Sequence, residues 1–434
     1  MDTLPPGPSL PPVVQTLRWM LRPIPFLERC RRRHGDVFTL RRGGFGRPMV
    51  IVSDPELVRA LYTDPRHEPP GGRRTALQPA MGARSVMLAH GAEHLARRRA
   101  LVPAFHGERM RAFEPTIREI TERAVDSWPD ARSFAALPRA QALTLEVVMR
   151  VVFGVDDAGR RARLRALLPG LIEATASPAR QLAGLVVRRA GRDRTPARLR
   201  ELRAAVDAIL REELGERRDG ARHAGDDVLS RLMAVRLDDG MPIGDEELLD
   251  QLVTLLLAGH ETTAAALAWT LHLLAHHPEP LARATSAVRR GDGNAYLRAV
   301  VMESLRVRPV VPLAGRRLTA RLEAGSARLP PGTEVAPSTW LVHTRADLYE
   351  DPLTFRPERW VDAPPPGYAW IPFGGGVRRC IGAEFAQFEM RVVLDVVLRR
   401  RDLAPAGPRV ERPVRRNVTL APHRGGRIRA RAVA

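Results

Sequence analysis

The feature that most constrains this chain is its only long apolar stretch, residues 248–275. A stretch of this length either crosses a bilayer or fills the centre of a large globular core. It contains Asp250, His260 and Glu261, and charged side chains are costly in the middle of a membrane-spanning helix. We therefore predict a long helix at the centre of a soluble fold, with no transmembrane segment.

The remaining sequence predicts one large fold that is mainly α-helical with a minor β portion. The 434 residues, 44% of them hydrophobic, provide a sizeable core, and no linker or repeat divides them. Short β-like runs at 37–40 and 49–52 predict a small sheet near the N-terminus. We expect one domain over residues 1–434 in three parts, listed in chain order: a Pro-rich segment with the small sheet (1–65), a helical body (93–308), and a Pro- and Gly-rich part with a last helix at about 382–400 and a β-like tail (309–434).

The net charge indicates which kinds of binding partner to expect, and the cysteines indicate the cellular compartment. The net charge is +20, and every one of the 69 residues counted as Lys or Arg is an arginine. We expect no nucleic-acid partner, because no nucleic-acid-binding motif accompanies this charge, whereas an acidic protein partner suits it. Cys30 and Cys380 form no disulfide framework, and the N-terminus lacks the pattern of a signal peptide, so we predict a cytoplasmic protein.

The most informative segment is a glycine-rich loop that precedes the last predicted helix and contains Cys380. A buried thiolate needs backbone N–H groups aimed at its sulfur, and a planar macrocycle can lie against backbone only where side chains are absent. Taken alone, Cys380 would be an inert buried cysteine. The surrounding glycines favour a ligand instead.

This loop resembles the haem-binding loop of the cytochrome P450 superfamily, whose spacing is matched by Phe373, Gly376, Arg378, Cys380 and Gly382. The resemblance implies haem b as cofactor, with Cys380 as the thiolate ligand of the iron. It implies haem contacts from Phe373, Gly374 and Gly382, and a charge-assisted pair between Arg378 and a propionate. In the implied P450 fold, the haem lies between the long central helix and the helix that follows Cys380.

A second pattern is Glu303 and Arg306, three residues apart on one helical face. Such pairs are common on solvated helices, so the pattern alone indicates little. Downstream, residues 355–360 resemble the P450 segment whose arginine, here Arg359, completes a buried network with the other two. The resemblance therefore implies a structural network that fixes the haem-loop region without touching substrate.

A third pattern lies in the long apolar helix, where Ala258, Gly259, Glu261 and Thr262 interrupt the apolar run. One explanation is a helix kink with the Thr262 hydroxyl bonded to a carbonyl one turn earlier. The segment also resembles the oxygen-activation motif of P450s. That resemblance implies that Ala258 and Gly259 leave room for O2 beside the haem, that Thr262 holds the hydroxyl there, and that Glu261 supplies protons. His260 falls at a variable position of the motif and receives no role.

Further propionate contacts are implied by residues outside these motifs. His94 and Arg98 are four apart and share one helical face, although a solvated basic helix would explain them equally well. P450s often carry His and Arg at these two positions. Arg316 resembles a further propionate arginine, although the adjacent Arg317 leaves the register open.

Together these residues indicate a haem-thiolate monooxygenase that inserts one oxygen atom of O2 into an apolar small molecule. The main alternative keeps the haem but changes the reaction, to a peroxygenase, an isomerase or a dehydratase. Glu261 and Thr262 argue against it, because a proton relay serves O2 cleavage. A cysteine hydrolase or a nucleic-acid-binding protein would leave the glycine-rich loop unexplained.

The resemblance also implies the partners. No flavin or nicotinamide module follows the last predicted strand, so we expect electrons from a separate protein, an acidic ferredoxin with its reductase. The basic residues that this donor would meet are Arg97, Arg98, Arg99, Arg378 and Arg379. The apolar segments near Leu256 and at 310–314, with the loop before His94, predict a lipid-like, terpenoid, steroid or polyketide-like substrate.

Overall fold

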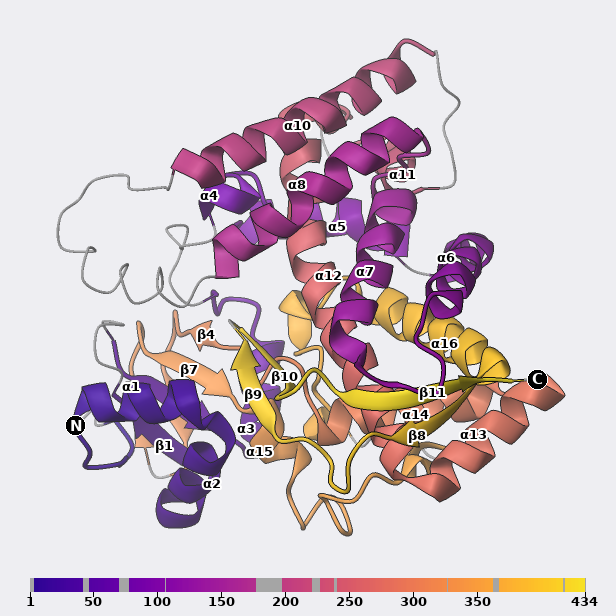
Figure 1. Ribbon diagram of the computed structural model, residues 1–434. Coiled ribbons are helices and arrows are strands. Elements are labelled where there is room, and N and C mark those ends of the chain that lie inside the picture. The colour runs from indigo at the N-terminus through magenta and orange to yellow at the C-terminus, as the bar shows by residue number, and fades with distance from the viewer. Residues whose placement is uncertain are drawn as a thin grey trace.

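The computed structural model in Figure 1 describes residues 4–41, 47–69, 78–105, 107–176, 197–220, 227–237, 240–325, 327–361, 367–416 and 418–433. The helices are α1 (Pro12–Leu21), α2 (Pro23–His34), α3 (Pro55–Thr63), α4 (Gln78–Met81), α5 (Gly91–Leu101), α6 (Glu114–Asp126), α7 (Ala136–Val147), α8 (Ala158–Ala176), α10 (Ala197–Arg218), α11 (Val228–Ala234), α12 (Asp245–His276), α13 (Pro278–Arg290), α14 (Asn294–Val307), α15 (Thr339–His343) and α16 (Ala383–Arg400). The strands are β1 (Val37–Leu40), β2 (Met49–Val52), β3 (Ser133–Ala135), β4 (Arg316–Arg317), β5 (Leu322–Ala324), β6 (Ala327–Leu329), β7 (Glu334–Pro337), β8 (Arg401–Pro405), β9 (Pro413–Arg416), β10 (Thr419–Pro422) and β11 (Arg427–Ala432).

The predicted central helix is α12, which runs for 32 residues through the middle of the molecule (Figure 1). Its first turn carries Asp245, Glu246 and Glu247, whose charges favour the positive end of the helix dipole. Among the described helices, α12 alone is long and apolar enough to cross a bilayer, yet 67% of its most apolar window is buried inside the protein. It is therefore the core helix that its internal charges predicted.

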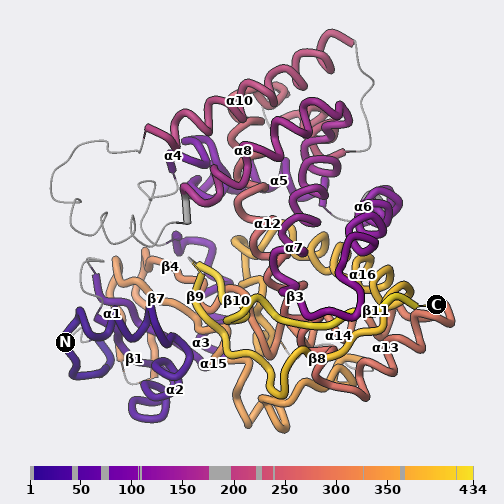
Figure 2. Tube along the Cα trace, in the orientation of Figure 1, coloured from indigo at the N-terminus to yellow at the C-terminus, as the bar shows by residue number. Residues whose placement is uncertain are grey.

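The strands expected near the N-terminus form at the predicted residues. β1 and β2 pair antiparallel, and β2 pairs in parallel with β7, which in turn pairs with β4. The last two strands come from the C-terminal third of the chain, so this sheet joins distant segments. In the same way, β9 from near the C-terminus lies beside α1 and α2 and contacts both helices (Figure 2).

One element differs from the sequence-based expectation, and the last helix agrees with it. The helical body is interrupted by β3, which pairs with β11 near the C-terminus, because a strand of three residues carries too little pattern to be recognised. The last helix begins at Ala383, directly after Gly382, and its N-terminus therefore points at the glycine-rich loop.

Candidate active site

The glycine-rich loop folds back on itself between η6 (Gly376–Arg378) and α16. The amide of Cys380 donates to the Phe373 carbonyl at 2.9 Å, and Gly374 takes a φ of 67°, which favours glycine. Gly376 has a φ of 63°, and a Cβ there would lie 1.7 Å from the Tyr62 carbonyl oxygen. The loop therefore needs glycine at 376 in order to pack against α3. At Gly374 and Gly382 an added Cβ would meet nothing within 4 Å.

Cys380 is solvent accessible, although it is set deep within the fold, whereas Cys30 is buried in the core. Burial raises the pKa of the Cys380 thiol, while a hydrogen bond from the Gly382 amide and the charges of Arg379 and Arg98 lower it. The donor expected from the sequence is present, because the Gly382 N–H points at the sulfur. Its place just before α16 adds the positive end of a helix dipole, which favours a thiolate.

Four basic side chains gather beside this loop. Burial, together with the nearby charges of Arg378, Arg98 and Arg316, lowers the pKa of His94 to about 3, so the four side chains lie close together. The three guanidinium groups donate to backbone carbonyls, Arg98 to Arg379 at 2.6 Å, Arg378 to Ala89 at 2.6 Å and Arg316 to Gly375 at 3.2 Å. These residues come from three segments that are far apart in the sequence, and the fold brings them close together.

No described carboxylate lies within ion-pair distance of Arg98, Arg316 or Arg378. Burial lowers the pKa of each guanidinium, that of Arg378 to about 10. Glu68, whose charge acts on Arg378, lies 3.5 Å from His90 instead. Arg316 is buried and Arg98 and Arg378 are half-buried, and cations removed from water without anions are unfavourable, so this cluster fits a ligand with negative groups.

The structure also answers which of two adjacent arginines joins the cluster. Arg316 is buried, and its guanidinium lies 4.7 Å from the centre of the Tyr62 ring. The backbone of Arg317 instead forms an isolated bridge with Glu68. The register left open by the sequence therefore favours Arg316.

One face of α12 is open in the middle of the helix, where most of the surrounding positions are buried. Ala258 is exposed and Gly259 and Thr262 are half-buried, in a helix whose neighbouring positions are packed. A Cβ on Gly259 would meet nothing within 4 Å. The Thr262 hydroxyl donates to the Ala258 carbonyl at 2.6 Å, so the local bond expected for a helix kink is present. Leu256, which the sequence placed at the substrate pocket, is fully buried, and its neighbour Leu255 lies on the open face.

Gln141 of α7 is a site residue that sequence reasoning missed. Its side-chain amide donates to Glu261 at 2.7 Å, and its carbonyl lies 2.9 Å from His260 Nε2. Burial lowers the pKa of His260. His260 therefore anchors α12 to α7, and Gln141 holds the adjacent carboxylate. No sequence signal marked Gln141, because a glutamine in a helix is unremarkable.

The predicted network of Glu303, Arg306 and Arg359 forms, and it is connected to the glycine-rich loop. Arg306 pairs with Glu303 at 2.7 Å, both fully buried, and Arg359 lies 3.3 Å from the same carboxylate. Trp360 Nε1 donates to Glu303 at 2.9 Å. His343 connects this network to the loop, since it contacts the Arg306 carbonyl at 3.1 Å and accepts the Ile371 amide at 2.8 Å.

Comparisons with known proteins agree with this arrangement. The family model described as Cytochrome P450 matches residues 5–426. A putative cytochrome P450 135B1 of Mycobacterium tuberculosis is 41% identical over 436 residues, covering 99% of this chain and 92% of that protein. A putative cytochrome P450 137 of the same organism is 39% identical and covers 93% and 84%.

The fold agrees as well. The structure of a retinoic acid bound cyanobacterial CYP120A1 matches with a TM-score of 0.82 and 24% identity over the full length of both chains. The chain belongs to the cytochrome P450 family. It is a haem b monooxygenase, an oxidoreductase that uses O2 and a redox partner.

Proposed function

We propose that the whole chain acts as one domain in which Cys380 ligates the haem iron. The observation that carries this proposal is the cluster of three guanidinium groups beside an accessible thiol, with Arg316 buried, Arg98 and Arg378 half-buried, and no described carboxylate paired with any of them. Haem b offers two propionates to such cations and an iron to such a thiolate. Arg98, Arg316 and Arg378, with His94, would hold the propionates.

The loop residues fit the same group. Gly374 and Gly382 leave open surface beside Cys380, and the half-buried Phe373 ring stacks edge-on against Trp370 with ring centres 5.9 Å apart. The Gly382 amide would keep its hydrogen bond to the sulfur and stabilise the thiolate. Cys30 is buried among apolar side chains and has no such role.

The open face of α12 would carry the reaction. When bound, the haem supplies the iron at which O2 is reduced and cleaved. Ala258 and Gly259 would leave room there, and the Thr262 hydroxyl, now bonded to its own helix, can turn to hold a proton donor in place. Glu261 would deliver protons, and Gln141 would orient its carboxylate.

The substrate is proposed to be a lipid-like, terpenoid, steroid or polyketide-like molecule. The support comes from apolar side chains with accessible surface: Leu255 on α12, and Val311, Leu313 and Ala314 before β4. Much of the loop before His94, residues 70–77, lies outside the described residues, as do residues 177–196.

The electron donor is proposed to be an acidic ferredoxin, with both proteins in the cytoplasm. Several of the arginines that we expect to meet the ferredoxin are already engaged within the protein. Arg97 pairs with Glu93 and Glu247, each at 2.8 Å, and Arg98 and Arg378 turn inward to backbone carbonyls. Arg379 remains as the half-buried arginine next to Cys380. A reduction rate that falls as salt rises would support electrostatic docking, and an unchanged rate would contradict it.

The test of the reaction uses isotopically labelled O2. Apolar compounds are first screened for those that shift the Soret band of the purified enzyme. We expect the product of such a compound to carry one labelled oxygen atom, with the second atom in water. Unlabelled product, or product formed without O2, would identify an isomerase, a dehydratase or a peroxygenase and overturn the proposal.

A further inference from the structure

Helix α1 has an unusual distribution of polar and apolar residues. It buries Gln15 and Thr16, which are 1% and 7% exposed. The Gln15 amide donates to the carbonyls of Pro8 and Leu10 at 3.0 and 2.8 Å, and its oxygen accepts the Arg41 amide at 2.9 Å. The inner side of α1 is therefore fixed by hydrogen bonds.

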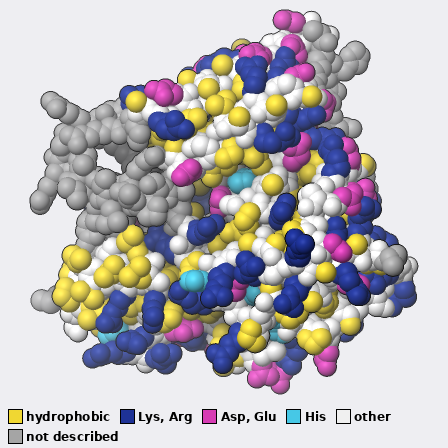
Figure 3. Space-filling model, in the orientation of Figure 1, with side chains coloured by type: hydrophobic (Ala, Val, Ile, Leu, Met, Phe, Trp, Pro, Cys, Tyr) yellow, Lys and Arg dark blue, Asp and Glu magenta, His cyan; other side chains and the backbone are white. Residues whose placement is uncertain are grey.

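The outer side of α1 is aliphatic. Val13, Leu17 and Leu21 are 72%, 54% and 63% exposed. They are spaced four residues apart and so form one stripe along the helix. Figure 3 shows hydrophobic side chains gathered over this part of the molecule. Folding does not require them there, and a continuous exposed apolar patch indicates an interaction surface.

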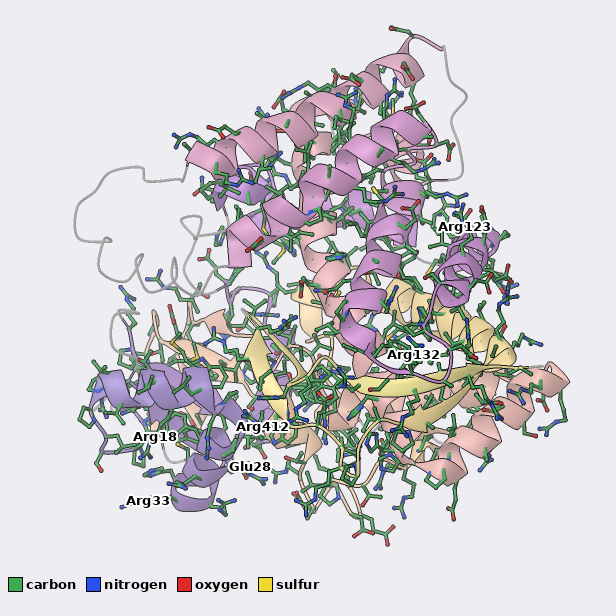
Figure 4. The ribbon with its side chains drawn as sticks, viewed as in Figure 1. Arg18, Glu28, Arg33, Arg123, Arg132 and Arg412 are labelled. Carbon is green, nitrogen blue, oxygen red and sulfur yellow. The ribbon has the colours of Figure 1, made fainter. Side chains whose placement is uncertain are left out.

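Arginines border the stripe. Arg18 and Arg22 are exposed on α1, and Arg29, Arg32 and Arg33 are exposed on α2. Residues 4–41 contain seven arginines against two acidic residues, Glu28 and Asp36. Both acids are engaged, because Glu28 accepts Trp340 Nε1 at 3.1 Å and Asp36 pairs with Arg31 at 2.7 Å. Figure 4 places Arg18 beside α1 and Arg33 on α2, on the same side of the molecule.

We propose that this α1 face, made of Val13, Leu17 and Leu21 with the bordering arginines of α1 and α2, docks the enzyme on an anionic lipid surface. A helix that lies in the membrane interface needs aliphatic side chains below the plane of the headgroups and cations at their level. The α1 face has both the aliphatic side chains, along the ten residues of α1, and the cations that border them. Among the described residues no acid pairs with these bordering arginines, and anionic headgroups would complement them.

Charge distinguishes this occupant from a second copy of the chain. Each copy carries +20, and two α1 faces in contact would bring their arginines together. The α1 face would lie on the surface of the bilayer, since among the described helices α12, which is long enough to span one, is mostly buried. It is also independent of the haem site, so either proposal can fail without the other.

The test measures binding of the purified holoenzyme to vesicles of phosphatidylcholine with and without phosphatidylglycerol. We expect strong binding to the anionic vesicles, weak binding to the neutral ones, and a loss of binding as salt rises. The triple variant Val13→Ser, Leu17→Ser and Leu21→Ser should weaken binding at least about tenfold, since full burial of one aliphatic side chain is worth about that factor. Arg18→Gln with Arg22→Gln should weaken it on anionic vesicles alone.

A matched control changes three other exposed apolar residues to serine, Met241, Leu353 and Val361, which are 61%, 64% and 41% exposed. The control should bind like the wild type, and all variants should keep the spectrum of the reduced carbonyl complex. The proposal is overturned if the wild type ignores anionic vesicles, or if the triple variant and the control lose binding equally. A wild-type dimer that the triple variant dissociates, without vesicle binding, would assign the face to self-association and also overturn it.

Discussion

The two sides of the active site are built in opposite ways. Behind Cys380, the loop is fixed by backbone hydrogen bonds, by the contact of Gly376 with α3, and by a chain of contacts through His343 to the Glu303 network. On the α12 side, Thr262 bonds within its own helix, and among the described residues Gln141 is the donor that holds Glu261. A cofactor ligand gains from rigidity, whereas groups that move protons must change partners.

The largest effect is expected from the rigid side. Arg306→Met leaves Glu303 charged and buried without its main partner, which costs about 3–5 kcal/mol. Arg359→Met should cost less, since its contact with Glu303 is longer. Urea unfolding of the holoenzyme measures both. Arg356→Met, which breaks the exposed pair with Glu350, is the control and should cost about 1 kcal/mol or less. Equal losses in all three variants would contradict a rigid network behind the loop.

The next effect is expected at the open face of α12. Thr262→Ala removes a hydroxyl whose described bonds stay within its own helix, so folding and the thiolate spectrum should persist. Electrons should then produce hydrogen peroxide instead of product. The measurement is product formed per electron consumed, with peroxide assayed in parallel. Thr263→Ala, on the buried side of α12, should remain coupled. Full coupling in Thr262→Ala would show that protons arrive by another route.

Gln141 provides a finer test of the same face. Gln141→Leu removes the donor to Glu261 and leaves the backbone contact with His260 intact. We expect turnover to fall by about tenfold, because a hydrogen bond to a charged group is worth at least about 1.5 kcal/mol, and we expect an unchanged thiolate spectrum. Glu261→Gln should slow turnover more, by roughly 10²-fold, with little peroxide. Ala142→Ser, at the exposed position next to Gln141 on the same helix, is the control. Unchanged turnover in Gln141→Leu would remove it from the site.

The smallest effect is expected in the pH dependence of stability, through His343 on the rigid side of the site. Burial, with the charge of Arg306, lowers the pKa of His343 from 6.5 to about 3. As the pH falls below 6.5, His343 becomes protonated in the unfolded chain before it does so in the folded protein. The stability present above pH 6.5 is therefore lost progressively as the pH falls toward 3. Unfolding at pH 7 and pH 5 should differ less in His343→Gln than in the wild type. The exposed His423→Gln should keep the wild-type difference, and an identical pH dependence in all three would contradict this role.

The same contrast explains how far the sequence could predict the site. The loop around Cys380 and the pair Glu303 and Arg306 are short-range patterns, so their geometry follows from spacing. His94 and Arg316 are distant in sequence, and only the resemblance united them. Gln141 was missed because its role depends on how α7 packs on α12. The segment near Leu256 reaches the open face through Leu255 instead, because one residue along a helix turns the side chain by about 100°.

The fold shows a similar limit. The central helix and the strands at 37–40 and 49–52 follow from periodicity and composition. The pairing of β2 with β7 does not, because nothing local in either strand specifies a partner nearly 300 residues away. The outward stripe on α1 was missed for another reason: apolar residues at helical spacing predict a buried face, and here Gln15 and Thr16 occupy that side.

The most direct test of the account compares the two cysteines. Cys380→Ser and Cys30→Ser are purified, reduced and exposed to carbon monoxide, and the absorption spectrum of each complex is recorded. We predict that Cys380→Ser loses the thiolate-type spectrum, because the loop then offers no thiolate to the iron, and that Cys30→Ser keeps it. A thiolate-type spectrum that survives in Cys380→Ser would contradict the assignment of the ligand, and with it the arrangement of the whole site.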